Sequence, residues 1–266
     1  MKNDNLGDRM KGYENIERRY LTRRMPTLIR LDGKAFHTFT RGFKKPFDMV
    51  LMQSMWDTAK YLCENIMGCK IAYTQSDEIT LLLTDYDNID TQAWFDKNII
   101  KMVSVSASMA TLAFNKAFSE NLKKYKAEVN KLTDESEFEE ALKLLSTYLK
   151  KENTALFDSR VFNIPKEEVC NAFIWRQQDA TRNSIQMIGQ ANFTHKELQG
   201  KSCNNIQEML FQEKSINFND FPAYQKRGLC IVKEQYDKDG TLRSRWVEDK
   251  DIPIFTQDRN YIEKYL

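Results

Sequence analysis

The sequence predicts an α+β fold of the ferredoxin-like type. The first observation is the order of the elements, because strand, helix, strand, strand, helix and strand follow one another between residues 27 and 164. The second is the short connection between the second and third strands, which is typical of an antiparallel hairpin. The third is the apolar periodicity of the two intervening helices, each of which can pack one face on a sheet.

Length and composition fit one domain over residues 1–266. With 41% hydrophobic residues, the chain can bury a sizeable core. We expect that core at about 27–164, with a charged helical excursion at 121–153 and a C-terminal part of helices and a hairpin at 165–266. The formal charge of +2 does not by itself indicate a nucleic-acid-binding protein. The first 30 residues are locally basic, which fits either a phosphate-facing edge or a solvated basic face.

The five cysteines are odd in number and form no CxxC pair. This pattern indicates neither a disulfide framework nor a zinc site, and it fits free thiols in a reducing cytoplasm. No apolar run reaches the roughly 18 residues of a membrane-spanning helix, and the N-terminus lacks the features of a signal peptide. We therefore expect a cytoplasmic protein that does not act at a membrane.

The core begins after a charged, amphipathic lead-in that Pro26 ends. A first strand is predicted at 27–31, and it stops at Asp32. A helix of about six turns is then predicted from Pro46, which the first helical turn accepts, to a C-terminal cap at Gly68. Its apolar face consists of Val50, Leu51, Met55, Ala59, Leu62 and Ile66.

The middle of the chain supplies a hairpin and a second core helix. Strands are predicted at 70–74 and 79–84, with Gln75–Glu78 at the tip that joins them. Small and apolar residues recur every three or four positions from about Phe95 to Phe118, which predicts the helix. A further extended segment is predicted at 155–164, before Pro165 stops it.

The segment 121–153 differs in kind, since it contains seven lysines and seven acidic residues in 33 positions. Its clear apolar ridge is formed by Leu142, Leu145 and Leu149. We expect a solvated helical excursion that contacts RNA or another subunit.

The C-terminal part is predicted to be mostly helical before a final hairpin. A helix is expected from Pro165 to about Gly189, followed by short helices at 193–213 and a loop at 217–226. Strands at 228–236 and 242–247 then form a hairpin. The first of these helices carries a polar stripe that consists of Arg176, Asp179, Asn183 and Gln186.

The predicted strand order brings two acidic turns together. In a ferredoxin-like sheet the first and third strands are antiparallel neighbours, so the end of the first lies beside the start of the third. Asp32 follows the first strand, and Asp77 and Glu78 precede the third. Clustered carboxylates repel each other and raise each other's pKa, and a divalent cation relieves that repulsion. The pattern predicts a phosphoryl-transfer site with a pair of Mg²⁺ ions, and an ordinary Asp-Gly turn is the alternative.

The loop after the first acidic turn is suited to bind phosphate. A triphosphate can be cradled by the backbone N–H groups of Lys34, Ala35, Phe36 and His37. Lys44 or Lys45 adds positive charge, and Ser76 can orient a phosphate oxygen. The alternatives are a local hydrogen bond for His37 and capping of the hairpin turn for Ser76.

Three residues of the C-terminal part are predicted RNA contacts, namely Arg176, Asn183 and Lys201. The sequence around Lys201 looks like a P-loop, but that motif requires glycine where this chain has His195, and no strand precedes it. We therefore reject a P-loop and keep Lys201 as a phosphate contact. For Arg176 the alternative is a surface ion pair with Asp179.

Three segments resemble the signature regions of a known family. They are RLDGKAFHTF at 30–39, AYTQSDEITL at 72–81 and WRQQDA at 175–180. In order and spacing they are similar to those of the tRNA(His) guanylyltransferase family, the 3'-to-5' nucleotide polymerases, over about residues 30–232. The resemblance implies a palm-like fold related to polymerases and nucleotidyl cyclases, two Mg²⁺ ions, and growth of a tRNA at its 5' end by nucleotidyl transfer.

The resemblance also implies roles for single residues. The metal ligands are Asp32, the backbone carbonyl of Gly33, and Asp77, with Glu78 completing the acidic motif. The triphosphate loop falls on 34–37, and the site that activates the tRNA end falls on Lys45 and Ser76. ATP and GTP are the expected nucleotides, and four identical subunits are the expected assembly.

The segment after WRQQDA departs from part of the family. Eukaryotic members that add guanosine to tRNA(His) carry HINNLYNT there, whereas this chain has TRNSIQMI at 181–188. The chain looks instead like the bacterial and archaeal "-like proteins", which restore missing 5' nucleotides on truncated tRNAs by templating on the opposite strand, and HKELQGKS at 195–202 has the look of that branch as well. We expect tRNA repair, with guanosine addition to tRNA(His) as the alternative. A nucleotidyl cyclase and a non-catalytic RNA-binding module are the further alternatives.

Overall fold

A six-stranded antiparallel sheet forms the centre of the computed structural model, which describes residues 5–266. The strands lie in the order β4-β1-β3-β2-β5-β6. Their bounds are β1 (Thr27–Gly33), β2 (Cys69–Gln75), β3 (Glu78–Leu83), β4 (Phe157–Asn163), β5 (Leu229–Lys238) and β6 (Thr241–Asp249). The first four strands have the order predicted for a ferredoxin-like sheet, so the predicted α+β palm-type fold is confirmed.

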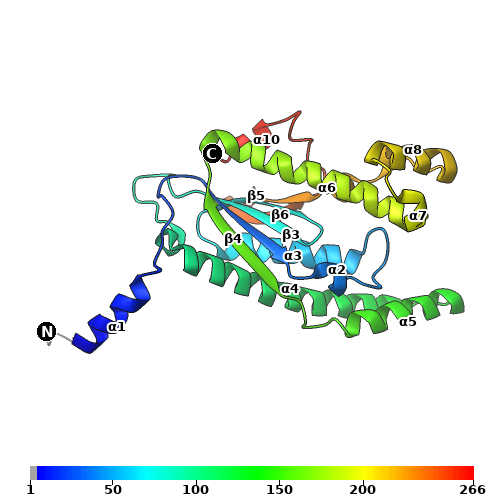
Figure 1. Cartoon of the computed structure of the whole chain (residues 1–266), viewed down its shortest axis with the longest axis horizontal. Coiled ribbons are helices and arrows are strands. Elements are labelled where there is room, and N and C mark those ends of the chain that lie inside the picture. Colours follow the sequence, from blue (N-terminus) through cyan, green and yellow to red (C-terminus); the bar gives the residue numbers. More distant parts are fainter. Residues whose placement is uncertain (1–4) are drawn as a thin grey trace.

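Helices cover both faces of this sheet (Figure 1), with α3 and α4 on one face and α6 on the other. The helices are α1 (Asn5–Asn15), α2 (Phe36–Phe39), α3 (Met49–Asn65), α4 (Ile99–Val129), α5 (Glu135–Leu149), α6 (Val169–Asn192), α7 (His195–Leu198), α8 (Cys203–Lys214), α9 (Ala223–Arg227) and α10 (Asn260–Glu263). Single 3₁₀ turns are η1 (Trp94–Lys97), η2 (Lys166–Glu168) and η3 (Phe218–Asp220).

Alternation along the strands divides the core into two layers. Ile29 and Leu81 face α3 and α4, whereas Leu28 and Leu82 face α6 and pack in one cluster with its Phe173. All five side chains are at most 1% exposed. Because successive strand residues point to opposite faces, residues two apart in β1 share a face, which decides where Asp32 lies.

The start of α3 differs from the prediction. The helix begins at Met49 rather than at Pro46, because the Asp48 carboxylate accepts the Leu51 N–H at 3.0 Å and caps the helix. With 17 residues it has about five turns rather than six. The predicted cap at Gly68 is also wrong, since the helix ends at Asn65. Gly68 instead permits a close approach to β3, because a Cβ there would lie 2.5 Å from the Thr84 carbonyl oxygen.

The charged segment 121–153 is helical as expected, but it is not simply solvated. Its first part continues α4, which runs without interruption to Val129, and α5 packs back against α4. Leu145 and Tyr148 are the buried residues of α5, whereas Leu142 and Leu149 are 41% and 53% exposed. The predicted leucine ridge is therefore wrong in two of its three members.

The C-terminal hairpin joins the sheet, which the sequence pattern left open. β5 pairs with β2, so that Ala72 lies opposite Ile231, and β6 pairs with β5. The loop before it is partly helical, since α9 follows Pro222. The sheet thus includes strands from both the predicted core and the C-terminal part.

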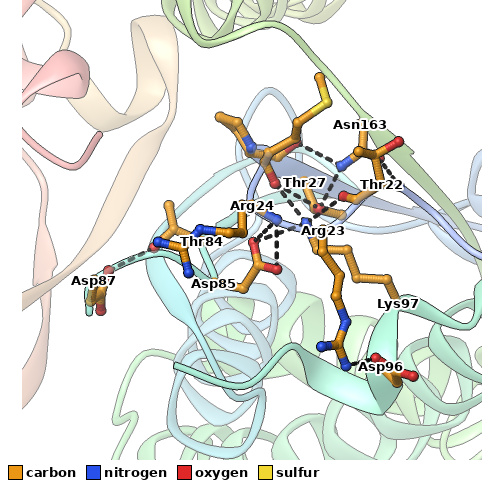
Figure 2. A network of polar contacts seen from close by, with 12 residues as sticks. Thr22, Arg23, Arg24, Thr27, Thr84, Asp85, Asp87, Asp96, Lys97 and Asn163 are labelled. Carbon is orange, nitrogen blue, oxygen red and sulfur yellow. Dashed lines mark hydrogen bonds and ion pairs between the residues drawn. The ribbon is translucent and has the colours of Figure 1, made fainter. Parts of the chain in front are cut away.

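A polar cluster fastens the N-terminal segment to the end of the sheet where β1 begins (Figure 2). Lys97 Nζ lies 3.0 Å from Asp85 Oδ1 and donates to the Thr22 carbonyl at 3.0 Å. The Arg24 N–H donates to Asp85 at 2.9 Å, and the Thr22 N–H donates to Asn163 Oδ1 at 2.7 Å. Burial lowers the pKa of Lys97, and the hydrogen bond and charge of Asp85 oppose that shift.

Beyond this cluster, α1 extends away from the sheet (Figure 1), and none of its residues is buried. The basic N-terminal segment is thus exposed along α1 but buried where it enters β1, while residues 1–4 lie outside the described residues. Within residues 5–266, no helix combines the length and apolar character that a membrane span requires.

Candidate active site

Asp32 and Asp77 come together at one end of the sheet, as the strand order predicts. Asp32 is the second-last residue of β1 and pairs with Glu78, the first residue of β3. Asp77 directly precedes β3, and the Gly33 N–H donates to the Asp77 carbonyl at 3.1 Å. The backbone therefore holds the two acidic segments against each other.

The carboxylate of Asp32 affects the ionisation of Asp77. Burial raises the pKa of Asp77, and the negative charge of Asp32 raises it further. A hydrogen bond from the Ser76 side chain and the charge of His37 act in the opposite direction. An ionised Asp77 is thus costly beside Asp32 unless a positive charge joins them.

The donor set fits Mg²⁺, which uses one or two carboxylates and completes its shell with water and substrate phosphate. Residues 5–266 contain no group of three or more His, Cys, Asp or Glu side chains suited to a metal ion. A cation at this position would therefore be held by Asp32, Asp77, the Gly33 carbonyl and substrate oxygens. Metal ligation by these three residues remains a prediction.

Gly33 is needed for the shape of the following loop. A Cβ at this position would lie 2.3 Å from the Phe36 ring, which is 3% exposed and belongs to the main core. Any larger residue would push this ring out of place. The glycine thus connects the acidic turn to the packing of α2.

The short helix α2 displays free backbone donors beside the acids. Ala35 precedes this helix in the left-handed conformation, with φ 54°. The first backbone hydrogen bond of the helix runs from the Thr38 N–H to the Ala35 carbonyl at 2.9 Å. The N–H groups of Ala35, Phe36 and His37 precede that bond and have no intrahelical acceptor. They can donate to a ligand, and triphosphate binding by these groups stays a prediction.

The same prediction is wrong for the backbone of Lys34. Its N–H donates to the Leu156 carbonyl at 2.8 Å, next to β4, and is not available to a ligand. The Lys34 side chain is exposed, so its ammonium group can still reach a phosphate.

A cleft of about 520 Å³ opens beside the acids. Lys45 lines it together with Ser76 and Asp77, and the α6 side chains of Met187 and Gln190 form part of its wall. The cleft therefore joins the two residues predicted for activation, Lys45 and Ser76, to one of the predicted metal ligands.

Asp48 holds the loop that forms one wall of this cleft, and the sequence interpretation missed it. Its carboxylate is buried and accepts the N–H groups of Lys44 at 2.9 Å and Leu51 at 3.0 Å. It also accepts the hydroxyl of Tyr148 from α5 at 2.5 Å. An aspartate just before an apolar-periodic stretch is a helix N-cap signal, so its capping role was recoverable from sequence. Its bond to Tyr148 was not.

The Glu78 carboxylate forms an ion pair with an arginine. Arg176 of α6 donates to both Glu78 oxygens, through Nε at 2.6 Å and Nη2 at 2.7 Å. Burial raises the pKa of Glu78, and the charge of Arg176 opposes that shift. The alternative pair of Arg176 with Asp179 also exists, at 3.0 Å, but the buried pair with Glu78 is bidentate. RNA contact by Arg176 stays a prediction, with its guanidinium engaged by carboxylates.

The other two predicted RNA contacts lie apart from each other. Asn183 lines a small recess of about 80 Å³ that adjoins the cleft at Ser76, together with Ser184, whose buried Oγ has no hydrogen-bond partner among the described residues. Lys201 is exposed in the turn between α7 and α8. Asn183 therefore lies next to the 520 Å³ cleft, whereas Lys201 lines neither that cleft nor the recess.

Comparison with known proteins places this geometry in a family. Residues 7–165 match the family model of tRNAHis guanylyltransferase. Among curated relatives, the tRNA(His) guanylyltransferase of Debaryomyces hansenii is 27% identical over 227 residues, which cover 80% of this chain and 76% of that protein. An uncharacterized protein of Acanthamoeba polyphaga mimivirus is 28% identical over 274 residues, covering 99% and 88%.

Solved structures give a closer likeness. A bacterial tRNA(His) guanylyltransferase-like protein in complex with ATP is 46% identical, with a TM-score of 0.82 and coverage of 98% of each chain. Such a protein in complex with GTP is 44% identical, with a TM-score of 0.78 and coverage of 98% and 99%. The enzyme of Saccharomyces cerevisiae is 20% identical over 92% of this chain and 98% of that one, and its TM-score of 0.64 shows a shared fold.

Proposed function

The chain belongs to the tRNAHis guanylyltransferase family of nucleotidyltransferases, and from this premise we propose that it restores missing nucleotides at the 5' ends of truncated tRNAs. The observation that carries the proposal is the meeting of Asp32 and Asp77 beside a cleft that contains Lys45 and Ser76. The likeness to a bacterial "-like protein", at 46% identity, supports repair over addition of a guanosine to tRNA(His).

The proposed reaction has two steps. In the first, an oxygen of the tRNA 5'-monophosphate attacks the α-phosphorus of ATP, the bond to the β-phosphate breaks, and pyrophosphate leaves. In the second, the 3'-hydroxyl of an incoming nucleoside triphosphate loses its proton and attacks the 5'-phosphate of the tRNA, and AMP leaves. GTP serves as an incoming nucleotide, and as the alternative activator. Pairing with the opposite strand selects the base.

This chain's own residues bind and orient the reactants. The ammonium group of Lys45 and the backbone N–H groups at 35–37 bind phosphate oxygens, and Ser76 orients one of them. Asp32, Asp77 and the Gly33 carbonyl would hold two Mg²⁺ ions, which activate an attacking oxygen and neutralise charge on the leaving group. Glu78 supports the site indirectly, because its carboxylate anchors Arg176 rather than facing a ligand.

The test is an extension assay with Mg²⁺, ATP, labelled nucleotides and a tRNA that lacks its first nucleotide. We expect one nucleotide to be added, and its identity to change when the opposing base is changed. Asp77→Ala should lower the rate by several orders of magnitude, whereas Glu213→Gln, which changes an exposed acid of α8, should not. Addition of guanosine whatever the opposing base would support the tRNA(His) alternative.

Other outcomes would point to the remaining alternatives. Formation of a cyclic nucleotide without RNA would indicate a cyclase, and tRNA binding without any extension would indicate a binding module. We further propose a cytoplasmic homotetramer, for which light scattering should give four times the chain mass of 31.4 kDa.

A further inference from the structure

A single exposed tryptophan lies next to the candidate active site. Trp175 of α6 is 52% exposed, whereas Trp56 and Trp246 are buried and Trp94 is partly buried. An exposed indole can act as a stacking platform for a base, because its ring is flat and accessible. None of the residues that line the nucleotide cleft is Trp175, so it is not part of that pocket.

Two arginines, one from β1 and one from α6, lie close to the indole ring. The Arg176 guanidinium carbon lies 4.5 Å from the centre of the Trp175 ring, and that of Arg30 lies 5.4 Å from it. Arg176 is fixed by Glu78, and the charge of Arg30 also acts on the Glu78 carboxyl, whose pKa it lowers. Both guanidinium groups therefore lie within cation–π distance of the ring, while about half of the Trp175 side chain stays exposed.

The indole is close to Asp32, the predicted metal ligand. Arg30 and Asp32 are two residues apart in β1, so both point to the face that carries α6 and lie about 7 Å apart along the strand. Arg176 bonds to Glu78, which is the direct partner of Asp32 in the β1–β3 ladder. Trp175 thus contacts two side chains that neighbour Asp32. Arg30 neighbours it along β1, and Arg176 does so through Glu78.

The sheet surface beside the indole is open and carries arginines. In β4, the residues that share this face are exposed: Asp158, Arg160 and Phe162. Arg160 lies directly opposite Arg30 in the ladder, and its contact with Asp158 is a loose 4.0 Å. Arg30 Nε is buried without a hydrogen-bond partner among the described residues. Two facing guanidinium groups repel each other unless an anion lies between or over them.

We propose that the exposed face of Trp175 stacks on the base at the 5' end of the RNA substrate and so positions that end at Asp32. Flat aromatic rings backed by guanidinium groups are suited to stack on nucleobases, and arginines attract the adjoining phosphates. The incoming nucleotide is not the occupant, because the cleft for its triphosphate is lined by the loop 33–48 and by α6 residues further along the chain. This inference rests on the proposed function.

The test uses the whole protein and a tRNA with 2-aminopurine as its 5'-terminal nucleotide, whose fluorescence falls when the base is stacked. Binding to the wild type should quench it, Trp175→Ala should abolish the quenching, and Trp175→Phe should retain most of it. Phe211→Ala, which removes a 56% exposed aromatic ring of α8, is the matched control and should bind as the wild type does.

Kinetics give a second readout. Trp175→Ala should raise the KM for tRNA about tenfold, which is at the low end of what one stacked base contributes, and leave the KM for ATP unchanged. An equal loss with ATP would indicate a folding defect and contradict the proposal. In the wild type, RNA should also protect the exposed tryptophan from quenching by iodide, which needs no variant.

The two proposals fail in distinguishable ways. If the wild type quenches 2-aminopurine but adds no nucleotide, the proposed function falls and the stacking site stands as an RNA-end site. If extension proceeds but Trp175→Ala matches the wild type in quenching and in KM, the stacking site falls. Iodide access to Trp175 that tRNA leaves unchanged would also overturn it, and would favour a protein partner for this surface.

Discussion

At the scale of single residues, Asp32 and Asp77 form a pair that is costly to ionise. The folded state raises the pKa of Asp77 through burial and through the charge of Asp32, so folding favours the protonated form. Stability from this group is therefore present at low pH and is lost as the pH rises through the raised pKa. The proposed cation would be held most strongly when both acids are ionised, so the proposed site costs the protein some stability.

The variant Asp77→Asn should consequently be more stable than the wild type without metal. At pH 7 we expect a melting temperature about 2–4 °C higher, which corresponds to about 1 kcal/mol for a chain of this size. The difference should shrink as the pH falls through the raised pKa of Asp77, because the wild-type side chain is then protonated as well. Adding Mg²⁺ should raise the melting temperature of the wild type and not that of the variant. Calorimetry checks this, with Glu213→Gln of α8 as the control, and a difference that is constant with pH would contradict it.

At the scale of secondary-structure elements, α5 is connected to the nucleotide cleft. The Tyr148 hydroxyl donates to Asp48, and Asp48 in turn holds the Lys44 N–H at the cleft wall. Burial and the negative charge of Asp48 raise the pKa of Tyr148, so the hydroxyl stays protonated and remains a donor at any physiological pH. The charged excursion therefore helps to fix the loop that carries Lys45.

Removing this one hydroxyl should loosen the loop without emptying the core. We expect Tyr148→Phe to lower the free energy of unfolding by about 1–3 kcal/mol, because a buried carboxylate loses a donor, and to weaken ATP binding severalfold. Tyr125→Phe is the control, since no hydrogen bond is found for that hydroxyl in residues 5–266, and it should cost less than about 0.5 kcal/mol. Denaturant unfolding and ATP titration measure both effects. Unchanged ATP affinity in Tyr148→Phe would refute the connection.

The polar cluster that holds the N-terminal segment contains one buried and one exposed ion pair, which can be compared. Lys97 and Asp85 are about 5% exposed, whereas Arg23 and Asp96 of the same region are 64% and 59% exposed. Lys97→Met leaves the Asp85 carboxylate buried without its counter-charge and should cost about 3–5 kcal/mol. Arg23→Met should cost less than about 1 kcal/mol. Chemical denaturation decides between these values, and equal losses in the two variants would contradict the difference in burial.

These elements also show which features can be read from sequence. The strand order, the hairpin and the juxtaposition of Asp32 with Asp77 follow from periodicity and topology, because alternating apolar residues and short turns are local signals. The start of α3 follows from its cap at Asp48 once that signal is weighed against Pro46. The buried face of α5 does not follow, since it depends on contacts made a hundred residues away in the chain, as the bond from Tyr148 to Asp48 shows.

Some features of the candidate site could likewise be predicted from the sequence, and others could not. The acids and the N–H groups of α2 were predictable because they lie within short segments next to strand ends. The pairing of Glu78 with Arg176 was not, because the two residues are 98 positions apart and only the packing of α6 on the sheet brings them together. The position of Trp175 beside Arg30 has the same origin.

At the scale of the whole molecule, the sheet is shared between the two parts of the chain. The family match ends at residue 165, yet β2 has β3 on one side and β5 on the other. Without the later residues, β2 would be an edge strand, and the α6 side of Tyr73, now 1% exposed, would face water.

A fragment of residues 1–165 should therefore be insoluble when produced alone. Co-production with a 166–266 fragment should return part of it to solution, because β5 and α6 then cover the exposed strand and face. Sedimentation of cell lysates measures this, with the intact chain as control. A soluble, monomeric 1–165 fragment with a cooperative melting transition would show that the second part is dispensable for folding.

The pairing of β2 with β5 also determines when the sheet can be completed during translation. Asp32 and Asp77 leave the ribosome early, but the strand that completes their sheet is about 150 residues beyond Asp77, which is about 8–30 seconds of translation. During that interval the nascent chain carries β2 as an exposed edge strand, together with an uncovered apolar face. Chaperone binding to the ribosome-bound chain should therefore be strongest after β4 emerges and should end once β5 has been released.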